Sequence, residues 1–152
     1  GKNKTPFPRE LRVSASAPNS NETGDMLFEI VSEISRSYEK TITEGESDVI
    51  IVSVSICNAA VNKGDSGFIK RAVAAADACI AKIVGLTSQY GGISLITSPY
   101  AAGNNDCRVP LVVVGADISL SLGRLSDIAP TMLDIMGLSH PDEMNGKSLI
   151  TQ

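Results

Sequence analysis

Two uninterrupted apolar runs constrain the fold of this chain more than any other feature. Residues 49–52 read Val-Ile-Ile-Val, and residues 111–114 read Leu-Val-Val-Val. Both runs are short, rich in β-branched residues and free of polar side chains, which is the pattern of a strand covered on both faces. Residues 93–97 predict a further strand, and the alternating residues 12–17 predict another.

Helical periodicity fills the intervals between these strands. Residues 25–40 and 68–90 each place apolar side chains three or four positions apart, with charged side chains on the opposite face in the first of them. The glycine pair at 91–92 ends the second helix. A shorter helix is expected over residues 125–136, with Ser126 or Asp127 as its cap.

Strands that alternate with helices at this spacing imply right-handed crossovers and a parallel sheet. We therefore expect an α/β fold, with a mostly parallel sheet of about four strands and helices on both faces. The expected organisation is a single domain over residues 1–152, in which residues 1–10 form an extended lead-in.

Composition removes several classes of partner. The formal net charge is −4 and aromatic residues make up 4% of the chain, without tryptophan, so we expect no nucleic-acid partner. Apolar runs are too short for a spanning helix, so we expect no membrane insertion. Cys57, Cys79 and Cys107 are odd in number and widely spaced, which favours free thiols in an intracellular, reducing compartment, either the cytoplasm or the interior of an organelle.

In parallel α/β folds, ligands bind in the loops beyond the carboxyl ends of the strands. The loops in question are residues 55–67 and 98–108. The letters of residues 64–67, Gly-Asp-Ser-Gly, resemble those around the nucleophile of chymotrypsin-like proteases. The chain has one histidine, His140, and no all-β pattern, so a helix cap at Asp65 or Ser66 is the better interpretation.

The carboxyl-terminal part carries a specific resemblance. Residues 123–137, Gly-Arg-Leu-Ser-Asp-Ile-Ala-Pro-Thr-Met-Leu-Asp-Ile-Met-Gly, and residues 143–150, Glu-Met-Asn-Gly-Lys-Ser-Leu-Ile, resemble the carboxyl-terminal signature of the cofactor-independent phosphoglycerate mutases, metal enzymes of the alkaline phosphatase superfamily. Residues 48–52, 68–79 and 91–97 resemble further parts of the same phosphatase-type segment. The resemblance implies a fold like half of an alkaline-phosphatase-type domain.

The positions that carry chemistry in this family are substituted here. The resemblance places the family's metal-ligand positions on Asn58, Asn62, Pro99 and Tyr100. These residues offer no carboxylate and no imidazole to two divalent cations. The serine nucleophile of the family belongs to a segment that this sequence does not resemble. We therefore expect no catalytic residue, no metal and no cofactor.

Three functions are compatible with this pattern. The first is a non-catalytic scaffold or interaction subunit of a larger complex, in which a protein partner or a second copy covers an exposed sheet edge. The second is a piece of a split or truncated mutase that interconverts 3- and 2-phosphoglycerate. The third is a phosphometabolite-binding module, with weak anion contacts from a small set of polar residues near a helix amino terminus: Asn58, Asn62, Ser66 and Asn104.

Overall fold

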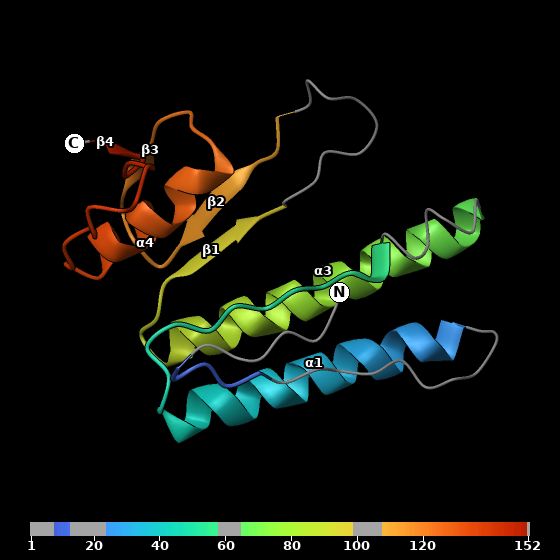
Figure 1. The fold of residues 1–152 in the computed structure, drawn as a ribbon. Helices are drawn as coiled ribbons and strands as arrows, with labels where there is room; N and C mark the ends of the chain where they lie inside the picture. The colour runs from blue at the N-terminus through green and yellow to red at the C-terminus, as the bar shows by residue number, and fades with distance from the viewer. Residues whose placement is uncertain (1–7, 13–23, 58–64, 99–107, 152) are drawn as a thin grey trace. The chain divides into compact units, whose positions relative to one another are not determined.

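The structure is a computed structural model that describes residues 8–12, 24–57, 65–98 and 108–151. The chain divides into two compact units, residues 1–91 and residues 92–152, and each is described by itself (Figure 1). The single domain over residues 1–152 stays a prediction. The predicted strand over residues 12–17 lies outside the described residues except for its first position.

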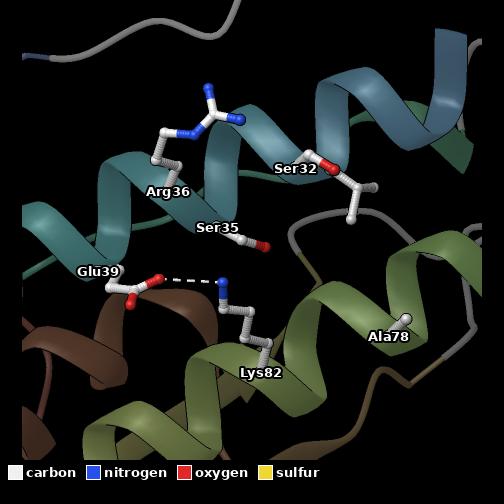
Figure 2. Close-up of a pocket in the computed structure, with 7 residues that line it drawn as sticks. Ser32, Ser35, Arg36, Glu39, Ala78 and Lys82 are labelled. Carbon is white, nitrogen blue, oxygen red and sulfur yellow. Dashed lines mark hydrogen bonds and ion pairs between the residues drawn. The ribbon is translucent and has the colours of Figure 1, made fainter.

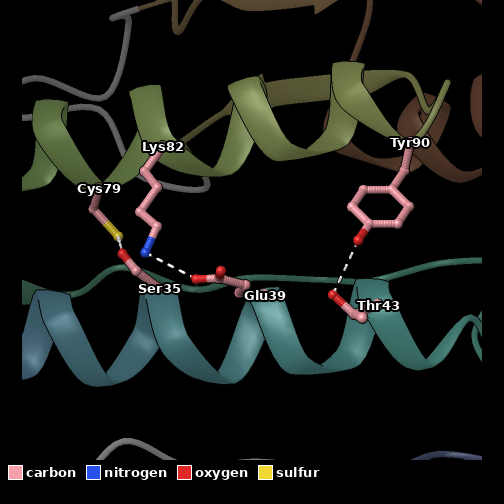
Figure 3. A network of polar contacts seen from close by, with 6 residues as sticks. All are labelled: Ser35, Glu39, Thr43, Cys79, Lys82 and Tyr90. Atoms are coloured by element: carbon pink, nitrogen blue, oxygen red, sulfur yellow. Dashed lines mark hydrogen bonds and ion pairs between the residues drawn. The ribbon is translucent and has the colours of Figure 1, made fainter.

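The first unit is built on two helices that lie side by side, α1 (Gly24–Glu44) and α3 (Ser66–Gln89) (Figures 1 and 3). Both confirm predicted helices: α1 extends beyond the predicted residues 25–40 at both ends, and α3 begins two residues before and ends one residue before the predicted bounds of 68–90. Their facing stripes form one apolar core, in which small alanines of α3 let the helix backbones approach closely. The buried members of this core are Leu27, Val31, Ile56, Phe68, Ala72, Ala75 and Cys79.

Local sequence fixes the ends of these helices. Asp65 caps α3, because its Oδ1 accepts hydrogen bonds from the backbone N–H groups of Gly67, at 2.8 Å, and Phe68, at 3.2 Å. The chain leaves α3 through Gly91, which has a left-handed φ of 70°, and leaves α1 through Gly45, with φ 66°. The capping role proposed for Asp65 from sequence is confirmed.

Residues 49–52 do not form the strand expected from their sequence. They belong to no helix or strand among the described residues. Val54 packs against the helical core and Ile56 belongs to it, whereas Val49 is 42% exposed and Ile51 is 87% exposed. The prediction of burial on both faces is wrong, because the side chains of Val49 and Ile51 are exposed, whereas Val54 and Ile56 face the helical core.

The second unit contains two small antiparallel sheets. β1 (Ser94–Thr97) pairs with β2 (Leu111–Val114) in the register Ser94↔Val114 and Thr97↔Leu111. β3 (Ser119–Leu120) pairs with β4 (Ile150–Thr151). The strands predicted over residues 93–97 and 111–114 are confirmed, and the two short strands were not predicted.

The expected mostly parallel sheet of about four strands is wrong. The described residues form two sheets of two strands each, both antiparallel. A parallel pair requires a crossover, normally a helix, whereas consecutive strands joined more directly pair antiparallel, as β1 and β2 do. Val112 is also exposed, so β2 is not covered on both faces as its sequence predicts.

A close approach at Gly115 holds the end of the β1–β2 hairpin. Its φ is 97°, and a Cβ atom there would lie 2.8 Å from the carbonyl oxygen of Gly92. Only glycine accommodates both constraints. The predicted last helix is confirmed as a 3₁₀ turn, η1 (Leu125–Asp127), that continues into α4 (Ile128–Ile135).

Candidate functional site

Most of the site residues expected from sequence lie outside the described residues. Asn58, Asn62, Pro99, Tyr100 and Asn104 are all in this group. Their grouping into one site therefore stays a prediction.

Ser66 is the one predicted anion contact that the structure describes. It is the exposed first residue of α3. The first-turn N–H groups of Gly67 and Phe68 already donate to Asp65, so an incoming anion would meet a carboxylate at this helix end. The anion-binding role of Ser66 stays a prediction.

The chemistry of the four substituted positions does not fit a pair of divalent cations. An asparagine offers a neutral amide oxygen, a proline offers no side-chain donor atom, and a tyrosine holds its proton at neutral pH. Two divalent cations need several anionic oxygens or neutral imidazoles around them. Within the ranges that the structure describes, no three His, Cys, Asp or Glu side chains gather closely enough to hold a metal ion.

The signature residues of the carboxyl-terminal part form a hydrogen-bonded lock around Asp127. Its Oδ2 accepts from the backbone N–H of Arg124 at 2.7 Å, and its Oδ1 accepts from the backbone N–H of Lys147 at 3.1 Å. These two bonds favour the ionised carboxylate and lower its pKa below the ordinary value of 3.8. One side chain thus caps the turn that begins α4 and holds the returning tail.

Thr131 makes the second half of this lock. Its Oγ1 donates to the carbonyl oxygen of Asp127 at 2.6 Å and accepts from the backbone N–H of Leu149 at 3.0 Å. Thr131 is fully buried, and Leu149 is buried beside it. Asp127, Thr131 and the tail residues 146–149 together form what we call the carboxyl-terminal lock.

Two glycines of the signature make room for the lock. A Cβ atom on Gly146 would collide with the carbonyl group of Ser126 and lie 3.1 Å from Cγ of Pro130. A Cβ atom on Gly123 would collide with the side chain of Leu149. The strong sequence signature in this part of the chain is thus explained by packing and backbone hydrogen bonds.

The sequence singled out Asp127 as a possible cap but gave no role to Thr131 or to these glycines. A threonine four residues after a capping aspartate was the available signal, since its hydroxyl can reach the carbonyl oxygen of the residue four positions before it.

A groove lies on the first unit between α1 and α3, with a volume of about 420 Å³ (Figure 2). Lys82 of α3 donates to Glu39 Oε2 across it at 3.0 Å. Arg36 forms no hydrogen bond or ion pair with the described residues. Because Glu39 neutralises Lys82, the groove presents one guanidinium and the hydroxyl groups of Ser32 and Ser35. No sequence pattern pointed to it.

A line of polar contacts ties α1 to α3 along the same interface (Figure 3). The hydroxyl of Tyr38 meets Oγ1 of Thr87 at 2.6 Å in the buried part, and Oγ1 of Thr43 meets the Tyr90 hydroxyl at 3.2 Å near the end. Ser35 Oγ lies 3.7 Å from the sulfur of Cys79, which is a buried free thiol. Burial makes Cys79 a structural rather than a reactive cysteine.

Comparison with known proteins gives the chain its family. No family model matches it. It is 35% identical to the 2,3-bisphosphoglycerate-independent phosphoglycerate mutase of Acetivibrio thermocellus over 136 residues, covering 79% of this chain and 26% of the mutase. It is 32% identical to the enzymes of the same name from Anaplasma phagocytophilum and Shewanella amazonensis, covering 100% and 99% of this chain and 34% and 32% of theirs.

These matches define the chain as a phosphoglycerate-mutase-like protein. More particularly, it is a relative of one segment of the cofactor-independent phosphoglycerate mutases, as the signature residues indicated. The chain spans between a quarter and about a third of the length of the curated relatives it matches.

No helix among the described residues has both the length and the apolar character needed to cross a membrane.

Proposed function

We propose that this chain is a non-catalytic, phosphoglycerate-mutase-like subunit that works by binding other proteins in a larger complex. The residue types at the four substituted positions carry the proposal. Asn58, Asn62, Pro99 and Tyr100 replace the metal ligands that the resemblance assigns to the mutases. A mutase of this kind depends on its metal ions. Replacing the metal ligands by residues that cannot bind the ions therefore abolishes the reaction instead of only changing its rate.

What the chain keeps supports the same proposal. The lock around Asp127 and Thr131 requires neither metal nor substrate, and it accounts for the most distinctive residues of the resemblance. The first unit keeps its two-helix core. The residues that hold the fold together are therefore retained in this sequence, whereas the residues at the resembled metal-ligand positions are substituted.

Exposed apolar side chains on the first unit support an interaction role. Leu11 and Phe28 are each 71% exposed, and Ile51 is more exposed still. Large apolar side chains in water favour association when they belong to a surface that a partner covers. We place the complex in a reducing, intracellular compartment, with the free buried thiol of Cys79 as support.

Manganese titration and an activity assay test the proposal together. We expect isothermal titration of Mn²⁺ into the chain to give only the heat of dilution. We expect no conversion of 3-phosphoglycerate to 2-phosphoglycerate in a coupled assay with Mn²⁺ present. Saturable Mn²⁺ binding that Asn58→Ala weakens, or turnover by the chain, would refute the proposal and favour the truncated mutase.

A matched variant sharpens the titration. Asn58→Asp together with Asn62→His restores two ligand types of the resembled family at two of the substituted positions. We expect this double variant to bind Mn²⁺ more tightly than the original chain, because a carboxylate and an imidazole are far better ligands than two amides. Equal, measurable affinity in both chains would show that the asparagines do not limit metal binding.

A further inference from the structure

We propose that the dipeptide Asn145–Gly146 is a site of spontaneous covalent modification. Asn145 deamidates there to a mixture of aspartate and isoaspartate, and the isoaspartate product opens the carboxyl-terminal lock. Both residues belong to the second unit, and the reaction involves no group of the first. It therefore requires no particular arrangement of the two units, and it does not depend on the proposed interaction role.

The reaction consumes one water molecule and releases ammonia. The backbone nitrogen of Gly146 attacks Cγ of Asn145, and its proton leaves with the side-chain amide as ammonia, which closes a five-membered succinimide. Water then opens the ring at either carbonyl carbon. Cleavage of the new N–Cγ bond gives aspartate, and cleavage of the original peptide bond gives isoaspartate, in which the main chain runs through the former side chain. Neither step is an oxidation or a reduction.

The sequence places this reaction at one position. Asn145 is the only asparagine in the sequence that is followed by glycine. Every other residue type after an asparagine carries a Cβ atom that crowds the attacking nitrogen, whereas glycine leaves it open.

Both reacting groups are free of internal partners. The side chain of Asn145 is exposed and forms no hydrogen bond with the described residues, and the N–H of Gly146 has no acceptor among them. A hydrogen bond to either group would have to break before the ring could close. An intramolecular attack is favoured where the two groups are adjacent and no such bond must be lost.

The lock itself requires the glycine. A Cβ atom at position 146 would collide with the carbonyl group of Ser126. Asn145 lies between a turn, in which the Met144 N–H donates to the Pro141 carbonyl oxygen at 3.0 Å, and the locked residues that follow. The packing that selects Gly146 therefore keeps the reactive pair in place while the asparagine side chain stays in solvent.

Isoaspartate changes the length of the main chain directly beside the lock. It inserts one methylene group between the Cα atom of residue 145 and the nitrogen of Gly146. Gly146 lies against Ser126 without room for another carbon atom, and the next residue, Lys147, donates its N–H to Asp127 Oδ1 at 3.1 Å. The longer main chain displaces this segment, so we expect the bond to Asp127 to be lost and the tail to open.

Ageing of the full chain tests the modification. The chain is incubated in mildly alkaline buffer and digested with trypsin, which cuts after Arg124 and Lys147 and releases the peptide 125–147. Mass spectrometry follows the amide-to-acid change, and an isoaspartyl-specific carboxyl methyltransferase detects isoaspartate. We expect loss of the parent peptide and accumulation of both products, faster at higher pH because the attacking nitrogen must lose its proton. Asn145→Gln, which would have to close a six-membered ring, should keep its peptide unchanged over the same period.

A second measurement tests the effect on the lock. Freshly prepared Asn145→Asp is the matched control, because it carries the new charge beside the exposed Asp142 and Glu143 but has a main chain of normal length. We expect the fresh variant to retain slow hydrogen exchange at the Leu149 amide and resistance of the tail to proteolysis. The aged chain that contains isoaspartate should lose both.

Three results would overturn the proposal. The first is a parent peptide that ages no faster than the peptide of Asn145→Gln. The second is an isoaspartate-containing chain whose Leu149 amide is as protected as in the fresh chain. The third is an equal loss of protection in fresh Asn145→Asp, which would show that charge rather than main-chain length opens the lock.

Discussion

Replacing Thr131 with valine removes the hydroxyl at the centre of the carboxyl-terminal lock while nearly preserving side-chain shape. The hydroxyl donates to the Asp127 carbonyl oxygen at 2.6 Å and accepts from the Leu149 N–H at 3.0 Å. Valine leaves the buried Leu149 N–H without its acceptor. An unsatisfied buried donor costs about 1–3 kcal/mol, so we expect Thr131→Val to lower the free energy of unfolding by about 2 kcal/mol.

Thr131→Ser is the matched control. Serine keeps both hydrogen bonds and removes one methyl group, at a cost of about 1 kcal/mol. Thermal unfolding followed by circular dichroism measures the difference, and a loss of about 2 kcal/mol corresponds to roughly 4–8 °C at this chain length. Hydrogen exchange of the Leu149 amide should accelerate in the valine variant and much less in the serine variant. A valine variant as stable as the serine variant, with Leu149 equally protected, would refute the reasoning.

Three further outcomes follow from the same structure. The lowered pKa of Asp127 contributes stability that is fully present above the ordinary pKa of 3.8 and is lost as the pH falls through the pKa of the folded state. We therefore expect Asp127→Asn to be less stable at pH 7 and to show a weaker loss of stability in acid, measured by urea unfolding across the pH range. An unchanged loss of stability in acid would contradict this. Gly146→Ala should destabilise the tail and speed its proteolysis, because the added methyl meets the backbone of Ser126, while Gly137→Ala, which meets no atom within 4 Å but has a φ of 67°, controls for backbone strain alone. Cys57, which is partly exposed, should react with a thiol reagent in the native chain before the fully buried Cys79, and equal rates would mean that α1 and α3 separate readily.

The helices were predictable because their signals are local. Residues 25–40 and 68–90 carry the apolar periodicity of α1 and α3, and Asp65 supplies a cap whose oxygen reaches the first turn. These features depend on side chains within a turn or two of each other. The residues of the candidate site, among them Asn58 and Pro99, lie outside the described residues, so their arrangement stays a prediction.

Strand pairing was not predictable, because it depends on what lies beside each strand. The runs at 49–52 and 111–114 are nearly identical in character, yet the first remains unpaired in the described structure and the second forms β2. Both are exposed on one side, at Ile51 and Val112. An apolar run indicates that a strand is stable where its side chains are buried. It does not indicate which neighbouring segments would bury them.

Sequence also understated the tail. β4 has two residues, Ile150 and Thr151, and too little pattern to be recognised. Its position follows from long-range bonds to Asp127 and Thr131, which only the folded chain brings near the tail.

The hydroxyl contacts between α1 and α3 have a consequence for how the two helices find their alignment. Apolar residues repeat at every turn of both helices. A shift of one helix along the other by one turn, about 5.4 Å, would therefore still bring their apolar faces into contact. Such a slip would separate the Tyr38 hydroxyl from Thr87 and the Thr43 hydroxyl from Tyr90, stranding the first pair away from water. The two hydroxyl pairs therefore contribute to the specificity of the helix pairing more than to its stability, because they favour one register of α1 against α3 over the registers one turn away.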